Sequence, residues 1–275
     1  MSTDMSLTYK TSSKLDHLKN ILYKMDKIVI AYSGGVDSTL LSKVAYDVLK
    51  EKALVVLAKS QLLPLTEIEY ARQLADDLKF NFIEIEFNPF IISSFIKNSS
   101  RRCYYCKKYL IDNLKQISTK KGISYICDGS NSDDLKEHRP GLKALIESGV
   151  RIPLAESNIT KNEVRVIAHE KGLPNWNKPP MSCLATRIPY GTTITPNLLK
   201  CIDEGESFLN NFHLQSVRLR HHGKIARIEV DDADWHIFST LETRKKINKY
   251  LKSLGFTYVS VDLQGYRSGS LNEAL

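Results

Sequence analysis

Two cysteines, Cys103 and Cys106, stand three positions apart within the stretch SSRRCYYCKKYL. A pair with this spacing can form a redox couple, half of a zinc site, part of an iron–sulfur site, or two buried small side chains. Positive charges beside a thiol favour its reactive thiolate form and attract anionic substrates, although they are also common where a charged helix begins. Four basic residues flank the pair: Arg101, Arg102, Lys107 and Lys108.

A second stretch, SGGVDS at residues 33–38, has the composition of a phosphate-binding loop. Glycines permit a tight turn whose backbone N–H groups face an anion, and the N-terminus of a following helix adds positive potential. The Walker A pattern is absent, and a plain turn between strand and helix is the alternative. If the loop holds ATP, a carboxylate within it is suited to Mg²⁺. The residues predicted to face a phosphate group and its Mg²⁺ here are Ser33, Gly34, Gly35, Asp37 and Ser38.

Acidic and amide side chains gather just after a later buried strand, in the stretch ICDGSNSDDLKEH. They are Asp128, Asn131, Asp133 and Asp134. Ligands of open α/β sheets bind at this end of the strands. The neighbouring carboxylates Asp133 and Asp134 are therefore candidates to hold Mg²⁺ or the ribose, and a solvated helix cap is the alternative.

Arginines mark a possible site for an anionic substrate. Arg187 lies beside Cys183 in the irregular, proline-rich segment 172–196. Arg218 and Arg220 share one face of a predicted strand because strand side chains alternate, and with Arg227 on the facing arm they can form a basic cleft. Guanidinium groups bind phosphate and carboxylate with two hydrogen bonds. The alternative is a solvated hairpin face.

The elements that must position these residues follow an alternating order. Apolar, β-rich runs alternate with helical patterns, which predicts an α/β fold with a parallel sheet and helices on both faces. After residue 195 the pattern becomes a small α+β unit. We expect a flexible segment 1–12, an α/β domain 13–195 that carries the glycine loop, and a smaller C-terminal α+β domain 196–275. Strands are predicted at 27–32, 53–60, 80–87 and 123–130, with a C-terminal helix 195–212, hairpin 216–230, helix 233–255 and strand 256–263.

Composition excludes several classes of protein. The 275 residues are 42% hydrophobic and 25% charged, as in an ordinary globular protein. No apolar run approaches the roughly 20 residues that span a bilayer, and no signal-peptide core is visible at the N-terminus. A cytoplasmic location is expected. Five cysteines are too few for a disulfide framework, and the net charge of +8 favours a polyanionic partner without choosing among them.

The SGGVDS hexamer resembles the loop of the N-type ATP pyrophosphatases, and the further segments CYYC, ICDGSNSDD, SCLATRIPYG and VRLRHHGK resemble the LarE family within that superfamily. This resemblance implies an ATP-dependent sulfurtransferase. Residues 13–195 would be an ATP pyrophosphatase domain of the adenine nucleotide alpha hydrolase-like class, and residues 196–275 a substrate-binding or oligomerisation domain. It also implies that ATP is bound by Ser33, Gly34, Gly35, Asp37 and Ser38. The family substrate is a pyridinium dicarboxylate mononucleotide, a precursor of the nickel-pincer nucleotide cofactor. Its carboxylate is adenylated, pyrophosphate leaves, and sulfur displaces AMP. The resemblance also implies a sulfur-handling role for Cys183, substrate binding by Arg218 and Arg220, and assembly into a homo-oligomer.

Two sulfur routes are known in the family. In one route, a cysteine at the Cys183 position gives up its own sulfur and is consumed. In the other route, three cysteines hold a [4Fe–4S] cluster that passes on an added sulfide. This chain has Cys103, Cys106 and Cys183, which we expect in loops at one edge of the sheet. We therefore favour the cluster route, fed by an external sulfide source. Zinc, with His138 as a possible fourth ligand, and redox or structural roles are the alternatives.

The other two cysteines, Cys127 and Cys201, are expected to pack in the core, since one falls in a strand and one in a helix. Two further functions are alternatives to sulfur transfer to a small nucleotide. A tRNA thiolation enzyme would suit the positive charge, but no RNA-binding module is visible in the sequence. A nucleotide or metal sensor without catalysis would bind ATP without releasing pyrophosphate, which the acidic residues Asp37, Asp133 and Asp134 argue against.

Overall fold

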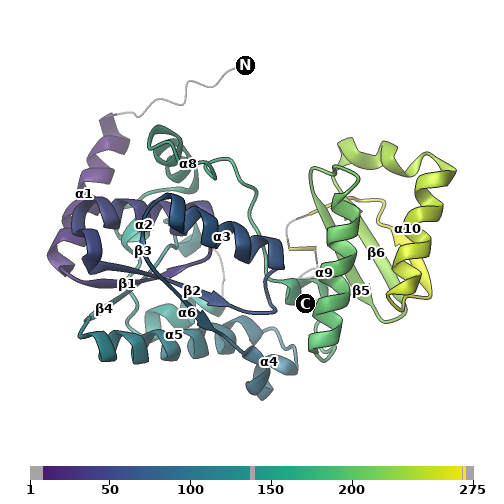
Figure 1. Ribbon diagram of the computed structural model, residues 1–275, viewed down its shortest axis with the longest axis horizontal. Coiled ribbons are helices and arrows are strands. Elements are labelled where there is room, and N and C mark those ends of the chain that lie inside the picture. The colour runs from purple at the N-terminus through teal and green to yellow at the C-terminus, as the bar shows by residue number, and fades with distance from the viewer. Residues whose placement is uncertain (1–8, 137–139, 268, 271–275) are drawn as a thin grey trace. The chain divides into compact units, whose positions relative to one another are not determined.

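The computed structural model describes residues 9–136, 140–267 and 269–270 (Figure 1). The chain divides into two compact units. Unit 1 comprises Met1–Ser60, Leu65–Pro89 and Cys103–Met181. Unit 2 comprises Gln61–Pro64, Phe90–Arg102 and Ser182–Leu275, so it draws on three separate segments of the chain.

Unit 1 is built on a sheet of four parallel strands in the order β3-β2-β1-β4. The register places Ile30 of β1 beside Val55 of β2 and Cys127 of β4. All three side chains are fully buried, which confirms the parallel sheet and the packing role of Cys127. The strands are β1 (Ile28–Tyr32), β2 (Ala53–Lys59), β3 (Asn81–Glu86) and β4 (Tyr125–Asp128).

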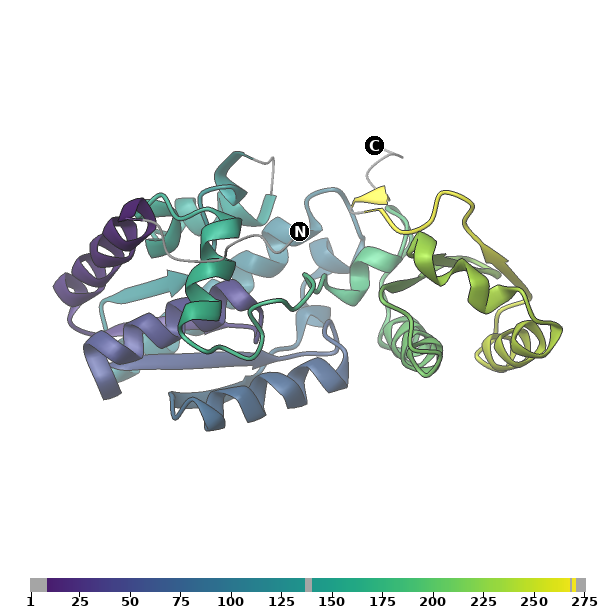
Figure 2. The same cartoon turned by 90° about the horizontal axis from the view of Figure 1, so that it is seen from above.

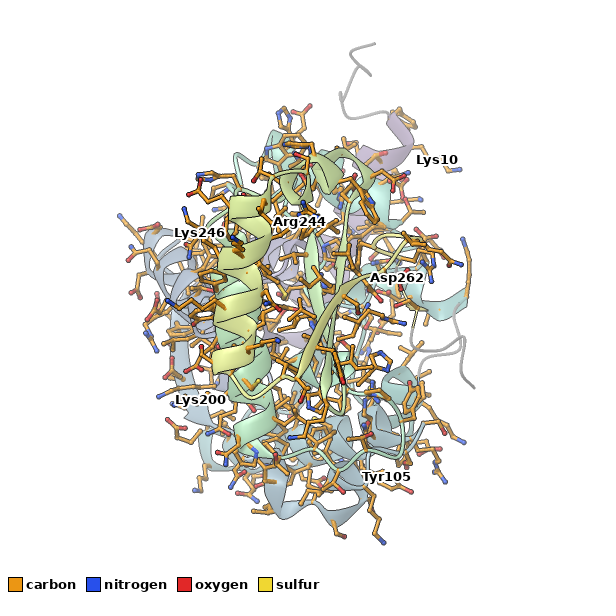
Figure 3. The ribbon with its side chains drawn as sticks, turned by 90° about the vertical axis from the view of Figure 1, so that its right-hand side faces the viewer. Lys10, Tyr105, Lys200, Arg244, Lys246 and Asp262 are labelled. Atoms are coloured by element: carbon orange, nitrogen blue, oxygen red, sulfur yellow. The ribbon has the colours of Figure 1, made fainter. Side chains whose placement is uncertain are left out.

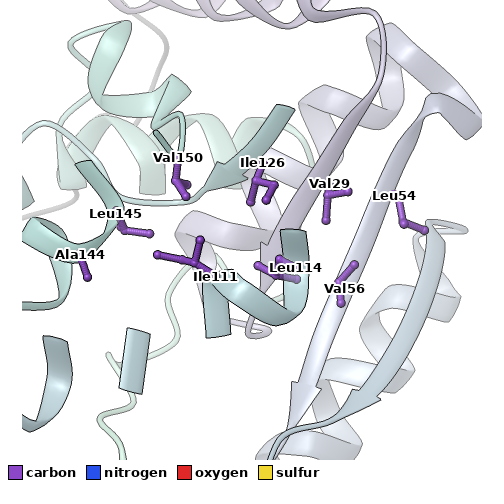
Figure 4. Packing of buried hydrophobic residues seen from close by; sticks show 9 residues of the cluster. All are labelled: Val29, Leu54, Val56, Ile111, Leu114, Ile126, Ala144, Leu145 and Val150. Atoms are coloured by element: carbon purple, nitrogen blue, oxygen red, sulfur yellow. The ribbon is translucent and has the colours of Figure 1, made fainter. Parts of the chain in front are cut away.

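Helices cover both faces of this sheet, as predicted (Figure 2). On one face, Val29, Leu54 and Ile126 pack against α5 and α6 in an apolar core (Figure 4). On the other face, the Cys127 sulfur lies 3.8 Å from the sulfur of Met25 in α1. The helices are α1 (Tyr9–Met25), α2 (Val36–Leu49), α3 (Leu65–Asp77), α5 (Arg102–Lys121), α6 (Pro140–Glu147), α7 (Pro153–Glu156) and α8 (Lys161–Glu170), with 3-10 turns η1 (Lys50–Lys52) and η3 (Asp134–Lys136).

Unit 2 contains a sheet of three strands in the order β5-β6-β7. β5 and β6 form the predicted antiparallel hairpin, whose turn at Gly223 has φ +61°, and β7 runs parallel to β6. The core between the sheet and its helices includes Leu219, Ile228 and Leu251. The elements are η2 (Pro89–Ile91), α4 (Ser93–Ile96), η4 (Leu184–Arg187), α9 (Pro196–Asn210), β5 (Val217–His222), β6 (Ile225–Val230), η5 (Asp232–Phe238), α10 (Leu241–Ser253) and β7 (Tyr258–Val261).

Two local expectations were wrong. The predicted helix 233–255 is divided into η5 and α10, because the Thr240 hydroxyl accepts a hydrogen bond from Thr243 N and starts a new helix. The Cys103–Cys106 pair, expected in a loop, lies in the first turns of α5. Cys201 of α9 packs at the edge of the unit 2 core, as expected, with its sulfur 3.5 Å from Leu254 O. Within the described residues, no helix is both long and apolar enough to cross a membrane.

Candidate active site

The glycine loop joins β1 to α2 with an open helix N-terminus. Gly35 is the N-cap residue of α2 and offers no capping side chain to the helix, while its own N–H donates to the Ser33 hydroxyl at 3.4 Å. The first N–H groups of α2 are therefore available to an anion. Gly34 has φ +74°, and a Cβ at this position would lie 2.6 Å from the Cβ of Ala71 in α3. Only glycine fits at this point, so the loop conformation depends on it.

Hydroxyl groups stabilise the loop from within. The Ser38 hydroxyl donates to Gly35 O at 3.1 Å and accepts from Ser33 N at 3.2 Å. The two serine hydroxyls are also 3.2 Å apart. The residue after β4, Gly129, passes so close to this turn that a Cβ would lie 2.9 Å from the Ser38 backbone. The ends of β1 and β4 thus meet beside the start of α2.

Asp37 lies in the first turn of α2 and is held by two residues from other parts of unit 1. Asn131 donates its amide to Asp37 Oδ1 at 3.1 Å, and the Lys161 ammonium at the start of α8 pairs with Oδ2. A cation therefore already sits against this carboxylate. Mg²⁺ is commonly bound by one or two carboxylates together with substrate phosphates, and Asp37 beside the open N-terminus of α2 fits that arrangement.

The acidic turn after β4 is tied into the protein framework. Asp133 Oδ2 accepts from Lys161 N at 2.9 Å, and this hydrogen bond is the main reason why the pKa of Asp133 is lowered. Asp134 Oδ2 accepts from Asn131 N at 2.9 Å. Burial alone would raise the pKa of Asp128, but Lys107 and hydrogen bonds from Ser130 outweigh burial and lower it. Asp133 thus binds the first N–H group of α8, whose N-cap residue is Thr160.

The cysteine pair lies on α5. Cys103 is exposed and Cys106 is half-buried. Residues three apart in a helix share one face, with Cβ atoms about 5–6 Å apart, so both thiols can contact one cluster. Lys107 donates to Asp128 Oδ2 at 3.1 Å. The negative charge of Asp128 is the main reason why the pKa of Lys107 is raised, and both thiols contribute further. This lysine therefore connects the CxxC segment electrostatically to the end of β4.

Two other cations beside the pair have defined partners. Arg102, the last residue of a unit 2 segment, donates to Asn98 Oδ1 at 2.6 Å and stacks on the Tyr190 ring at 4.4 Å. Lys108 donates to Ser148 Oγ at 3.1 Å. The basic cluster thus orders the start of α5, in line with the helix-start alternative.

Cys183 belongs to unit 2, directly before η4, and is half-buried. Its carbonyl accepts from Thr186 Oγ1 at 2.7 Å and from Arg187 Nη1 at 3.1 Å. The three predicted cluster cysteines are therefore divided between the units, with Cys103 and Cys106 in unit 1. Among the residues that the structure describes, no group of three or more metal-ligating side chains is assembled. His138, named above as a possible zinc ligand, lies outside the described residues.

The predicted substrate-binding arginines are buried inside unit 2. Arg187 is fully buried and donates from Nε and Nη2 to the two carboxylate oxygens of Glu206, both at 2.9 Å. Arg220 donates to Glu229 at 2.9 and 2.7 Å. Arg218 is also buried, and burial and the charge of Arg187 lower its pKa. A solvated hairpin face, the alternative above, does not describe these residues.

Two residues beside the glycine loop were missed by sequence reasoning. Lys161 follows a helix cap but lies far along the chain from its partner Asp37. Asn175 is almost fully buried in the proline-rich segment and donates to Gly34 O at 3.0 Å and to Thr39 Oγ1 at 2.9 Å. Its own carbonyl oxygen is buried without a hydrogen-bond partner. The proline-rich composition predicted a functional loop, but nothing in it identified this asparagine.

Replacing Asn175 with alanine is expected to lower the free energy of unfolding by about 1–3 kcal/mol, because Gly34 O and the Thr39 hydroxyl lose a buried donor. Urea unfolding followed by circular dichroism measures the change. Asn210→Ala at the exposed end of α9 is the matched control, with an expected change within about 0.5 kcal/mol. Equal changes in the two variants would show that Asn175 does not brace the loop.

Comparison with known proteins completes the description of the site. Residues 11–117 match the NAD synthase family. The chain is 38% identical over 256 residues to the pyridinium-3,5-bisthiocarboxylic acid mononucleotide synthase of Lactiplantibacillus plantarum, covering 92% of each chain. It is 40% identical over 263 residues to an uncharacterized protein of Synechocystis, covering 96% of this chain and 98% of that one. A glutamine-hydrolyzing GMP synthase component of Thermoplasma acidophilum is 26% identical over 194 residues, 65% of this chain and 63% of its own length.

Proposed function

This chain belongs to the LarE family of ATP-dependent sulfurtransferases, and from that premise we propose that it converts a carboxylate of a pyridinium dicarboxylate mononucleotide into a thiocarboxylate. The product would be an intermediate of the nickel-pincer nucleotide cofactor. ATP binding is supported by one observation above all: the uncapped N-terminus of α2 follows Gly34 and Gly35, and Asp37 lies in its first turn. We further propose a cytoplasmic location and small-molecule partners.

The first step would be adenylation. A substrate carboxylate oxygen attacks the α-phosphorus of ATP, and the bond to the β-phosphate oxygen breaks to release pyrophosphate. The N–H groups at the start of α2 and the hydroxyls of Ser33 and Ser38 would stabilise the departing negative charge. Mg²⁺, when bound, neutralises charge on the phosphates, and Asp37 would hold it. Asp133 and Asp134 would contact the ribose or a further metal ion from the turn after β4.

The second step would be sulfur transfer. A sulfur nucleophile attacks the acyl carbon, the new C–S bond forms, and the C–O bond to AMP breaks. We propose that Cys103, Cys106 and Cys183 hold a [4Fe–4S] cluster, which supplies the sulfur atom when bound. The placement of Cys103 and Cys106 on one face of α5 supports this route. In the alternative route, the Cys183 thiolate attacks the acyl carbon and displaces AMP. Elimination then breaks the Cβ–Sγ bond with loss of the Cα proton, which leaves dehydroalanine in the chain and sulfur on the product.

The remaining proposed roles belong to the arginines and to the C-terminal part. Arg218 and Arg220 would bind the phosphate and carboxylates of the substrate, with Glu229 fixing Arg220 in place. Arg187, fully buried against Glu206, would support the segment that carries Cys183 through its bond to the Cys183 carbonyl. Guanidinium groups held in place by a neighbouring carboxylate lose little freedom when they bind a ligand.

We propose that residues 196–275 bind substrate and mediate homo-oligomerisation, while residues 13–195 bind ATP.

Anaerobic purification tests the sulfur route. The protein is expected to be brown, to contain about four irons per chain, and to turn over many times with added sulfide. Cys103→Ser is expected to lose the iron, whereas Cys201→Ser, a cysteine outside the proposed site, is expected to keep it. A colourless protein that stops after one turnover would overturn the cluster and favour the consumption of Cys183.

A further inference from the structure

Unit 2 carries a hollow of about 340 Å³ bounded by η5, the first turns of α10, and strands β6 and β7. Its deepest residues are apolar, since Ile228 and Ile247 are 0% and 2% exposed. Leu241 is 59% exposed and forms an apolar edge of the hollow. The complete lining is Ile228, Phe238, Leu241, Arg244, Lys245, Ile247, Asn248, Val259 and Val261.

The hollow is separate from the arginine cluster of unit 2. Strand side chains alternate between the two faces of a sheet. Ile228 of β6 therefore lies on the opposite face from its neighbours Arg227 and Glu229. Neither residue lines the hollow, so the proposed sulfur-transfer chemistry makes no use of this space.

Two cations stand at the rim of the hollow. Arg244 and Lys245 are exposed, and neither is paired with an acidic side chain within the described part of the chain. The nearby first-turn acid, Glu242, is engaged 2.7 Å from Lys246. Figure 3 labels Arg244 and Lys246 on opposite sides of α10, so the Glu242–Lys246 pair leaves the charge at the rim uncompensated. The N-terminus of α10 adds positive potential at the same end.

We propose that this hollow binds a small organic anion with an apolar body, such as an aryl or alkyl carboxylate, phosphate or sulfonate. An apolar floor with a few polar groups at the mouth is typical of small-molecule sites, which begin at about 300 Å³. The apolar body would pack on Phe238, Leu241 and Val259, above the buried Ile228 and Ile247, and the anionic head would meet Arg244 and Lys245. Charge complementarity selects an anion over a neutral or cationic ligand of the same shape.

The test uses 1-anilinonaphthalene-8-sulfonate, which combines an aromatic body with one anionic group. Titration of the full-length native protein, followed by fluorescence, is expected to show one site per chain whose affinity is unchanged by saturating ATP. The double variant Arg244→Gln/Lys245→Gln is expected to raise the dissociation constant roughly tenfold, because each partly exposed charge pair contributes a few-fold. The uncharged analogue N-phenyl-1-naphthylamine is expected to bind both proteins equally.

The matched control is Lys249→Gln/Lys252→Gln, which removes the same charge from α10 at residues that do not line the hollow. Its dissociation constant is expected to change less than about twofold. The proposal is overturned if the dye does not bind, if the control weakens binding as much as the rim variant, or if ATP displaces the dye. A loss of pyrophosphate release on mutating the glycine loop would bear on the proposed function alone.

Discussion

Replacing Cys183 with alanine is expected to abolish thiocarboxylate formation, by at least about 1,000-fold, while ATP–pyrophosphate exchange with the dicarboxylate substrate continues. Both proposed sulfur routes need the Cys183 thiol, either as a ligand or as the sulfur donor. Exchange requires only the adenylation step, and the glycine loop proposed for that step belongs to unit 1, whereas Cys183 belongs to unit 2. Mass spectrometry of the nucleotide product and an exchange assay with labelled pyrophosphate measure the two steps separately.

The matched control for this prediction is Cys201→Ala, whose thiol is half-buried and contacts the Leu254 carbonyl. It is expected to retain both activities. Cys103→Ala and Cys106→Ala then separate the routes, since a cluster requires all three proposed cysteines, whereas a sacrificial Cys183 requires only itself. If Cys183→Ala still produced thiocarboxylate, neither route could hold.

The largest expected effect on stability comes from the buried ion pair of unit 2. Glu206→Gln is expected to lower the free energy of unfolding by about 3–5 kcal/mol, because it leaves the guanidinium of Arg187 buried without its counter-charge. Glu206 Oε1 also accepts from Leu219 N at 2.9 Å, so the change weakens an anchor between α9 and β5. Guanidinium chloride unfolding of the full chain measures the effect.

Glu204→Gln, a near neighbour on α9, is the control. Glu204 is half-buried, with its side chain 43% exposed, and lies 3.7 Å from Lys200, so its loss is expected to change stability by less than about 1 kcal/mol. The double variant Arg187→Met/Glu206→Leu is expected to recover only part of the lost stability, because a packed apolar pair avoids the uncompensated charge but leaves Leu219 N without its acceptor. Equal stability of Glu206→Gln and Glu204→Gln would contradict the proposed importance of the ion pair.

The sequence predicted the parallel sheet well because buried strands leave a strong local signal. The runs around Ile30 and Val55 are apolar without interruption, and such runs are typical of strands covered on both faces. The division near Thr240 was missed because a capping hydroxyl inside a helical pattern looks like an ordinary surface residue. The start of α5 before Cys103 was missed for a related reason, since the charges and tyrosines around the pair mask the helical rhythm.

The candidate site was predictable only where its residues are consecutive. Gly34, Gly35 and Asp37 lie in one short stretch whose chemistry can be recognised directly. Lys161 and Asn175 reach the same loop from more than 120 residues away, and no local pattern specifies such a contact. The partners Glu206 and Glu229 were missed likewise, because an acidic residue in a surface pattern gives no sign that it will be buried against an arginine.

The three-segment make-up of unit 2 constrains how the protein folds during synthesis. Gln61–Pro64 and Phe90–Arg102 leave the ribosome long before Ser182–Leu275. Leu184 N bonds to Leu62 O, and Asn98 donates its amide to the carbonyls of Pro189 and Thr192. These early segments cannot form their native contacts until Ser182–Leu275 has been synthesised, whereas most of unit 1 can already assemble. A truncation after Met181 would therefore leave the early segments permanently unpartnered, so neither half of this chain can be excised as one continuous piece.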